Sequence, residues 1–322
     1  MEFYARAALM LLFATLSQGA NSQTFPSKPV RLVVPYPPGG NVDIVGRLLV
    51  PKMSETLGQP VVVDYRAGAN GAIGSEHVAR AAPDGYTIII GNSATHVTSQ
   101  LLTKNLPYDP IKDFTPITAA VEPVTFLLMN PGVPANNLRE LLDYAKRNPG
   151  KVAFGSIGIG SNLHLTGELI NKFAGIEMVH VPYKGLAQAV TDTIAGQVQI
   201  TFSSPSASIG FMKAGKLRVM AVVTSARYPA LPDVPAAGEI IPGFENPSGW
   251  FGYFGPAKLP GPVLARINNA IVRALSAEDV RTKLNEGGMA VIANTPEEFA
   301  AFQKKSFEIY ARAIQAAGLK PE

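Results

Sequence analysis

The sequence predicts an α/β protein with two domains, and three observations lead to this prediction. The chain has 322 residues, which is about two domains' worth at ~100–200 residues each. Short apolar runs that are typical of buried strands alternate with helical segments, and this alternation occurs in two series. Glycine occurs 30 times and proline 27 times, and many of the glycines stand between a strand and the following helix.

The composition excludes several functional classes. Hydrophobic residues make up 47% of the chain, which is enough to bury a sizeable core and argues against disorder. Cysteine is absent, so disulfides, thiolate zinc sites, a cysteine nucleophile and a lipid-modified cysteine are impossible. The net charge is only +4 and no run of Lys or Arg occurs, so nucleic-acid binding has little support.

The first 22 residues are predicted to be a secretory signal peptide. Arg6 precedes an apolar run at residues 7–16, and Ala20-Asn21-Ser22 suits the small-x-small rule for cleavage. The run is shorter than the ~20 apolar residues that span a bilayer, so it is not a membrane span. The alternative to a signal peptide is a buried N-terminal helix. The position and the flanking residues favour the signal, so we expect an exported, soluble protein without a lipid anchor.

The first series of elements begins with an apolar run at residues 30–36, bounded by Pro29 and Pro37, which is typical of a buried strand. Apolar residues then follow at helical spacing over residues 42–57, where Pro51 predicts a kink because it lacks a backbone donor. The series continues with strands at 61–65 and 87–91, a helix at 72–81, and extended runs at 115–121 and 124–129.

The alternation then restarts and predicts a second domain. Helices are expected at 138–148, 162–173, 186–195 and 208–214, and strands at 152–155, 178–182, 198–202 and 217–223. Residues 227–247 are proline-rich and loop-like, and 249–255 could form a strand. The final helices at 263–275, 277–286 and 296–317, with a short strand at 290–292, have too few strands for a third domain. We expect them to pack onto one of the first two.

Three glycine-bearing connections lie at the carboxyl ends of predicted strands, at residues 37–41, 68–71 and 155–162. Open α/β sheets bind ligands at this edge, and the following helix N-termini attract anions. For any one connection the alternative is ordinary turn chemistry. Three of them, divided between two domains, predict an anion-binding cleft. Walker and G-x-G-x-x-G patterns are missing, so a carboxylate is the simpler anion.

Catalytic and metal-binding patterns are weak. Residues 91–95 read GNSAT and nearly match a nucleophile elbow around Ser93, but Thr95 replaces the final glycine. Ser93 and Thr95 could equally donate hydroxyl groups to a ligand. The four histidines form no close metal-binding pair, and no cofactor is expected. His164 could contact a ligand or be a packed helix residue, and Lys184 could be a ligand cation or a surface charge.

The sequence resembles the substrate-binding proteins of tripartite tricarboxylate transporters, the periplasmic Bug receptor family. The resemblance extends from Pro26 to about Gly318. The blocks that carry it, in order, are Lys28-Pro29-Val30-Arg31 through Pro37-Pro38-Gly39-Gly40 with Asp43, Leu57-Gly58-Gln59-Pro60-Val61-Val62-Val63, Ala79-Arg80-Ala81-Ala82-Pro83-Asp84-Gly85-Tyr86-Thr87, Leu106-Pro107-Tyr108-Asp109-Pro110, His180-Val181-Pro182-Tyr183-Lys184-Gly185 and Leu231-Pro232-Asp233-Val234-Pro235.

This resemblance implies a two-domain periplasmic-binding-protein (Venus flytrap) fold, type II-like, with two interdomain crossovers. The implied domains are residues 23–122 plus 252–322 and residues 123–251. It also implies a non-enzymatic, monomeric periplasmic receptor that captures a small carboxylate, including an aromatic acid or a dicarboxylate, and delivers it to transporter membrane subunits. The alternatives are a ligand-sensing receptor for a signalling partner and an exported serine hydrolase that uses Ser93.

By motif position, the resemblance assigns ligand contacts to both domains. The assigned residues are Pro38, Gly39, Gly40, Asp43, Ala69, Asn70, Ser93 and Thr95 in the first domain, and Ser156, Gly158, Ser161, His164, Tyr183 and Lys184 in the second. We add Ser203, because many relatives have Phe-Asp-Asn where this chain has Phe202-Ser203-Ser204. Loss of that acid is compatible with a more apolar or more acidic ligand, including an aromatic carboxylate.

Overall fold

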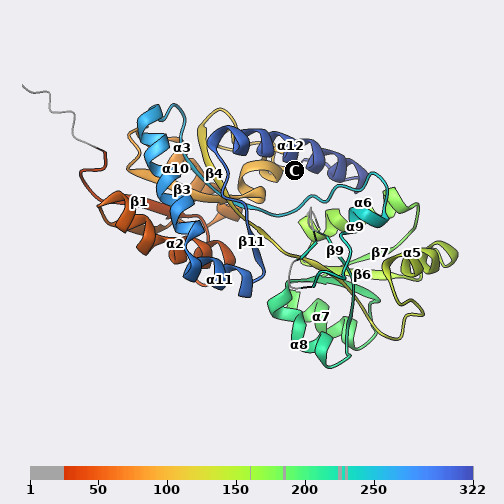
Figure 1. Cartoon of the computed structure of the whole chain (residues 1–322). Coiled ribbons are helices and arrows are strands. Elements are labelled where there is room, and N and C mark those ends of the chain that lie inside the picture. Colours follow the sequence, from red (N-terminus) through yellow and green to blue (C-terminus); the bar gives the residue numbers. More distant parts are fainter. Residues whose placement is uncertain (1–24, 160, 184–185, 224–226, 229–230, 322) are drawn as a thin grey trace, which may run out of the picture.

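The structure is a computed structural model that describes residues 25–159, 161–183, 186–223, 227–228 and 231–321. The expected signal segment and Lys184 lie outside the described residues. Two separate sheets form the centres of two domains, which lie side by side (Figure 1). The expected α/β fold class is confirmed.

The first sheet contains six strands in the order β11-β4-β10-β3-β1-β2. Its strands are β1 (Val30–Val34), β2 (Val61–Tyr65), β3 (Thr87–Asn92), β4 (Phe114–Pro123), β10 (Phe251–Pro256) and β11 (Met289–Val291). β1 pairs in parallel with β2 and β3, whereas β10 is antiparallel to both β3 and β4. The carboxyl ends of β1, β2, β3 and β4 therefore lie at one edge.

The second sheet contains five strands in the order β7-β6-β8-β5-β9. Its strands are β5 (Phe126–Met129), β6 (Ala153–Ser156), β7 (Val179–Pro182), β8 (Ile200–Ser203) and β9 (Arg218–Val222). β6 pairs in parallel with β7 and β8, and β5 is antiparallel to β8 and β9. This arrangement repeats the order of the first sheet without its β11.

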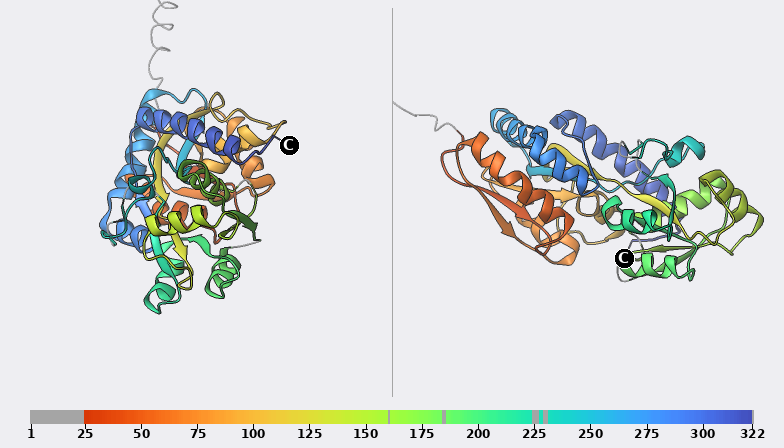
Figure 2. Two further views of the ribbon diagram at one scale, coloured as in Figure 1. Left: turned by 90° about the vertical axis from the view of Figure 1, so that its right-hand side faces the viewer. Right: turned by 60° about the horizontal axis from the view of Figure 1, so that its bottom comes forward.

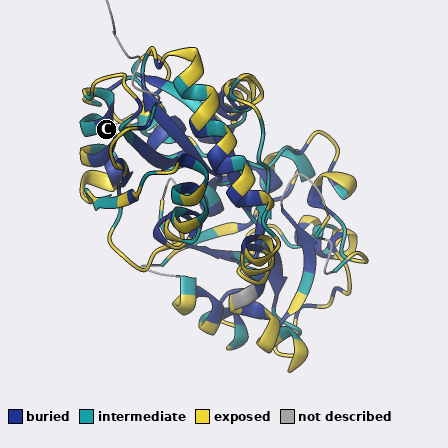
Figure 3. Cartoon of the chain, turned by 60° about the vertical axis from the view of Figure 1, so that its left-hand side comes forward, coloured by how far each residue is buried: buried dark blue, intermediate teal, exposed yellow. Residues whose placement is uncertain are grey.

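Helices cover both faces of each sheet, and the alternation of apolar residues along the strands explains why (Figure 3). Leu32 and Val34 pack towards α2 and α10, whereas Val33 joins the opposite core with α12. The helices of the first domain are α2 (Asn41–Leu57), α3 (Ala72–Ala79), α4 (Ser99–Leu102), α10 (Gly261–Ser276), α11 (Glu278–Glu286) and α12 (Pro296–Ala316), with short helical turns η1 (Ala69–Gly71) and η2 (Ala94–Thr98).

The helices of the second domain are α5 (Leu138–Arg147), α6 (Asn162–Ala174), α7 (Leu186–Ile194), α8 (Pro205–Lys213) and α9 (Ala237–Ile240). One apolar core continues across both domains on the side where α12 packs against α6. Figures 1 and 2 show α12 extending from the first domain towards the second. The domains are thus joined by side-chain packing as well as by the chain itself.

The chain crosses between the two sheets twice, as expected: first from β4 to β5 and again from β9 to β10. α10, α11, β11 and α12 return to the first domain, as predicted for elements with no sheet of their own. The domain limits expected at 122/123 and 251/252 stay predictions. Phe251, expected as the last residue of the second domain, is the first residue of β10 in the first sheet.

Several local features add detail to these expectations. α2 is one helix that includes Pro51, and the kink expected at this proline stays a prediction. The N-cap of α2 is Gly40, and Asn41 is the first helical residue. Short helices at residues 94–102 and 237–240 were not predicted, because they are only one or two turns long. No described helix has the length and apolar character needed to cross a membrane.

Candidate functional site

The connection after β1 is exposed at the start of α2. Pro38, Gly39 and Gly40 are all exposed. Gly39 has φ of +90°, a conformation that residues with a side chain rarely adopt. Gly40 has an ordinary φ of −78° and supplies no side chain to cap the helix. A Cβ at Gly40 would meet no atom closer than 3.9 Å, so the space beside this amide is open.

The buried carboxylate of Asp43 holds this connection in place through two hydrogen bonds. Its carboxylate accepts hydrogen bonds from the Gly39 amide at 2.7 Å and from the Tyr65 hydroxyl at 2.7 Å. The side chain is buried and joins the connection after β1 to the end of β2. The hydrogen bond to Asp43 is the main cause that raises the pKa of Tyr65. The structure therefore places Asp43, expected as a ligand contact, as a buried brace.

The connection after β2 is a strained turn that leads into α3. Ala69 and Asn70 both have positive φ, 45° and 52°, between Gly68 and Gly71, which are also left-handed. A Cβ at Gly71 would lie 2.5 Å from Thr95 Cγ2, so this glycine allows the second and third connections to pack together. Ala69 and Asn70 are exposed at the same edge as Gly40.

The connection after β3 is held by Asn92. The Asn92 side chain accepts a hydrogen bond from the Thr95 amide at 2.9 Å and donates one to the Tyr36 hydroxyl at 3.1 Å. Burial raises the pKa of Tyr36 to about 12, so this hydroxyl keeps its proton. The Thr95 hydroxyl is fully buried and lies 2.8 Å from His96 Nδ1. Thr95 therefore braces the loop, in contrast to its expected role as a donor to ligand.

Ser93 lies at the junction with α12. Its backbone amide donates to the Trp250 carbonyl at 3.2 Å, and the side chain of Ser93 is buried. The buried ring of Trp250 belongs to the core with Phe254 and does not line a cleft. The neighbouring imidazole of His96 contacts Thr95 rather than Ser93, and burial lowers the pKa of His96 to about 3. The geometry gives Ser93 a positioning role and no support as a nucleophile.

In the second domain, hydroxyl groups organise the connection between β6 and α6. Ser161 caps α6 by accepting a hydrogen bond from the His164 amide at 3.2 Å. The Ser161 hydroxyl donates to the Gly158 carbonyl at 2.7 Å. The Gly158 amide donates to the buried Ser156 hydroxyl at 3.2 Å, and Gly158 has φ of +122°. The connection is thus a compact, neutral turn at the start of a helix.

Two histidines support this turn from beneath. Ser156 Oγ lies 2.7 Å from His180 Nε2, and the rings of His180 and His164 are stacked with centroids 3.9 Å apart. His164 Nε2 lies 3.7 Å from Glu168 Oε1 and its side chain is buried. Burial, with the neighbouring His164, lowers the pKa of His180 to about 4, so its ring is neutral at pH 7. His164 is therefore part of the support of the turn.

The last two expected positions of the second domain lie at the ends of β7 and β8. Tyr183 is partly exposed, and its amide donates to the Ser156 carbonyl at 2.9 Å, which places it beside the β6 connection. Ser203 is buried at the end of β8, and its hydroxyl has no hydrogen-bond partner among the described residues. Lys184 lies outside them.

The two edges meet at Gly249, on the second crossover. A Cβ at Gly249 would lie 3.3 Å from Asn162 Nδ2, at the start of α6, and 3.9 Å from Ser93 Oγ. A second approach lies at Gly288, before β11, where a Cβ would be 2.8 Å from Pro205 Cδ, at the start of α8. The β3 connection of the first sheet and the β6 connection of the second therefore approach each other at the second crossover.

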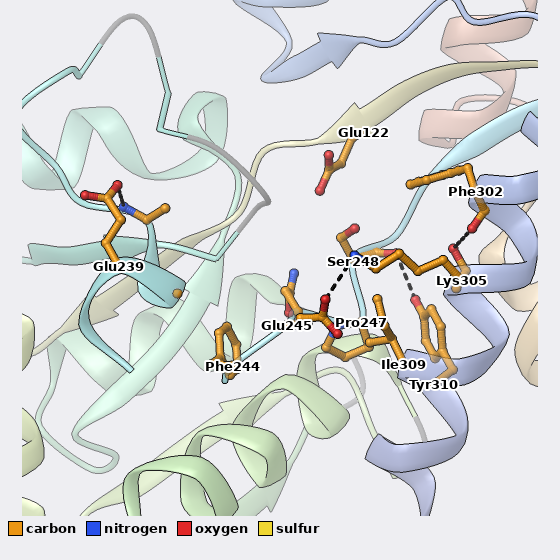
Figure 4. A pocket seen from close by; sticks show the side chains of 14 residues that line it. Glu122, Glu239, Phe244, Glu245, Pro247, Ser248, Phe302, Lys305, Ile309 and Tyr310 are labelled. Carbon is orange, nitrogen blue, oxygen red and sulfur yellow. Dashed lines mark hydrogen bonds and ion pairs between the residues drawn. The ribbon is translucent and has the colours of Figure 1, made fainter. Parts of the chain in front are cut away.

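A cavity of about 460 Å³ lies beside the second crossover (Figure 4). It is lined by Glu122, Ala236, Gly238, Glu239, Phe244, Glu245, Asn246, Pro247, Ser248, Phe302, Lys305, Ser306, Ile309 and Tyr310. Tyr310 donates to the Ser248 carbonyl at 3.1 Å, and Glu245 forms ion pairs with Lys305 and Arg312. None of the expected ligand residues lines this cavity.

Sequence reasoning missed the residues that hold the connections. Tyr65 and Asn92 brace the first domain, and His180 supports Ser156 in the second. A signal existed for His180, which stands in the family block at 180–185, but its partner is 24 residues away in the chain. No cluster of three or more His, Cys, Asp or Glu that could bind a metal occurs among the described residues.

The family of the chain follows from comparison with known proteins. A model of the tripartite tricarboxylate transporter family receptor matches residues 45–319. The chain belongs to this receptor family. It is 38% identical over 311 residues to a Pseudomonas sp. (strain P51) protein described as a UPF0065 protein in the tcbD-tcbE intergenic region, covering 96% of this chain and 92% of that protein.

Solved structures agree with this family and with the fold. A periplasmic transporter is 40% identical with a TM-score of 0.72, covering 92% of this chain and 99% of the other. The R. palustris protein Rpa4515, solved with adipate, is 32% identical with a TM-score of 0.75, covering 92% and 100%. MatC from Rhodopseudomonas palustris, with bound malate, is 33% identical with a TM-score of 0.69, covering 90% and 100%. This protein is thus a periplasmic solute-binding receptor and not an enzyme.

Proposed function

We propose that this receptor captures a small carboxylate between its two domains and delivers it to the membrane subunits of a tripartite tricarboxylate-type transporter. The convergence of strand-to-helix connections from both sheets at Gly249 carries this proposal. Relatives that were solved with adipate and malate support a carboxylate as the ligand class.

The chemistry of the connections suits a carboxylate. The exposed backbone at Gly39, Gly40, Ala69 and Asn70 lies at the carboxyl edge of the first sheet, beside the amino ends of α2 and α3. Helix N-termini present free N–H groups and a partial positive charge, so they stabilise an anion. The Ser156–Ser161 turn precedes α6, so the second domain also presents a helix N-terminus to an anion. A ligand that contacts the connections of both domains would hold the two domains closed, with the two crossovers acting as the hinge.

The proposal includes export by an N-terminal signal at residues 1–22, a mature protein without a lipid anchor, and a monomeric state. Expression in a Gram-negative host followed by fractionation tests the first of these. The signal hypothesis requires a periplasmic protein whose N-terminus lies near residue 23.

Calorimetric titration of the purified protein with citrate, malate, succinate, adipate and benzoate tests the ligand class. At least one acid is expected to bind in a 1:1 ratio, and the corresponding neutral amide is expected not to bind. Binding of none of these acids, or equal binding of the amide, would contradict the proposal. Uptake of the bound acid by membranes that contain the transporter subunits then separates transport from a purely sensory role.

A further inference from the structure

Large exposed apolar side chains gather on the connections that form the two facing edges. Ten such side chains are exposed among the described residues, and four of them stand in or just after the connections that follow β1, β2 and β6. These four are Ile44, Ile73, Ile157 and Ile159. The connections are a small part of the chain, so this concentration requires an explanation beyond the scattered exposure that is normal on protein surfaces.

The four isoleucines lie in these connections or in the first turn of the helix that follows. Ile44 is in the first turn of α2, where its amide bonds to the Gly40 carbonyl at 2.9 Å. Ile73 is in the first turn of α3, and its Cδ1 would be 2.6 Å from a Cβ at Gly68, so it covers the second connection. Ile157 and Ile159 flank Gly158 in the second domain, and Ile159 is 70% exposed.

The isoleucine side chains offer no hydrogen-bond partner to a hydroxyl substituent, and the described residues of these connections contain a single carboxylate that could accept from an ammonium group. Asp43 is the one carboxylate in the described residues of these connections, and it already accepts hydrogen bonds from Gly39 and Tyr65. It is buried, 2% exposed, behind the loop rather than beside the open space. Ser203, at the end of β8, is neutral. A substituent that needs a charged acceptor would lose its hydration here without compensation.

We propose that the ligand is a carboxylate with a hydrocarbon body, an aliphatic chain or an aromatic ring without hydroxyl or ammonium substituents, which Ile44 and Ile73 of one domain and Ile157 and Ile159 of the other cover on closure. This inference rests on the proposed function, because the backbone amides bind the carboxylate while the isoleucines select the rest of the molecule.

The test is a calorimetric comparison of acids that differ only in the body of the molecule. Succinate is compared with malate and tartrate, which add one and two hydroxyl groups, and adipate and benzoate extend the hydrocarbon. Succinate is expected to bind at least about tenfold more tightly than malate, and adipate or benzoate more tightly than succinate. Tighter binding of malate or tartrate than of succinate overturns this inference but leaves the proposed function intact. If no acid binds, the proposed function fails and the inference fails with it.

A matched pair of variants locates the effect. Ile159→Ser removes the most exposed of these isoleucines, and its expected effect is about a tenfold weaker affinity for the best hydrocarbon acid with little change for malate. Ile111→Ser is the control, because Ile111 is 50% exposed but precedes β4, at the opposite edge of the first sheet. Equal losses in both variants, or no loss in Ile159→Ser, would contradict the role of the isoleucines. Thermal unfolding of both variants verifies that each is folded.

Discussion

The two domains have the same strand order around their central sheets but hold their binding loops by different chemistry. In the first domain, a buried carboxylate, Asp43, ties the β1 connection to Tyr65. In the second, the neutral hydroxyl of Ser156 lies 2.7 Å from His180 Nε2, and the ring of His180 stacks on the ring of His164. One architecture thus presents backbone amides in two ways, and the two loops should respond differently to substitution and to pH.

The largest expected effect comes from closing the open space beside the first loop. Gly40→Val should weaken carboxylate binding by about 100-fold, equivalent to the loss of two charge-assisted hydrogen bonds at ~1.5 kcal/mol each. Gly40 has an ordinary φ and open surroundings, so the variant should fold normally. Gly210→Val on α8, where a Cβ also meets open space, is the control. Calorimetric affinity close to that of the wild type in Gly40→Val would exclude this amide from the site.

Asp43→Asn tests the charged brace of the first domain. The Asn side chain is neutral and accepts at one atom only, so the bond from Gly39 loses its charged acceptor and the Tyr65 hydroxyl must accept from the amide nitrogen instead of donating to a carboxylate. We expect a decrease of about 2 kcal/mol in the free energy of unfolding, measured by urea denaturation, together with weaker ligand binding. Tyr65→Phe, which leaves the bond to Gly39, should have the smaller effect. If Asp43→Asn loses affinity with unchanged stability, Asp43 contacts the ligand directly.

His180→Gln tests the neutral support of the second domain through pH. The pKa of His180 is lowered from 6.5 to about 4 in the folded protein, so between these pH values the unfolded chain binds more protons than the folded one. Stability that is present above pH 6.5 should therefore be lost as pH falls from about 6.5 to 4.

The His180 contribution should be about 1–2 kcal/mol, after allowance for solvent screening of a half-buried ring. Urea denaturation across this pH range should give a shallower loss for His180→Gln than for the wild type. The His180→Gln variant should still lose some stability as pH falls, because burial also lowers the pKa of His96 in the first domain, to about 3. Identical pH profiles for variant and wild type would argue against a buried neutral His180.

The smallest expected effect concerns the helix caps. Ser161→Ala removes the side-chain cap of α6 and should cost about 1 kcal/mol of stability. α2 has Gly40 at the same position and no side-chain cap, so Gly40→Ala should change stability by much less. Thermal unfolding of the two variants measures the difference, and equal changes would mean that the two helix starts do not differ as the structure indicates.

Much of the fold was accessible from local sequence patterns. The strands at 30–36, 61–65 and 87–91 are mostly apolar, and the helices between them have regular apolar spacing, so both were predicted within a few residues. The short helices at 94–102 and 237–240 were missed because one or two turns are too short to show a period.

The roles of individual site residues were much less accessible. Thr95 and Asp43 were expected to face a ligand, since both stand at a ligand-binding edge and have polar side chains. The structure turns both inwards, because Thr95 packs against Gly71 and His96 while Asp43 finds Tyr65. A residue type at a loop position does not determine which way its side chain points when partners from other strands compete for it.

The sequence by itself determined the α/β class, the two series of elements, the glycine connections at strand ends and the family. These features depend on residue spacing and on the φ values that glycine allows, which are local properties of the chain. Only the tertiary structure decided that Ser156 meets His180 and that Gly249 brings Ser93 beside Asn162. It also gathered exposed isoleucines from both domains onto facing edges. Such contacts join segments far apart in the sequence, so they depend on how the two sheets pack, which no local pattern encodes.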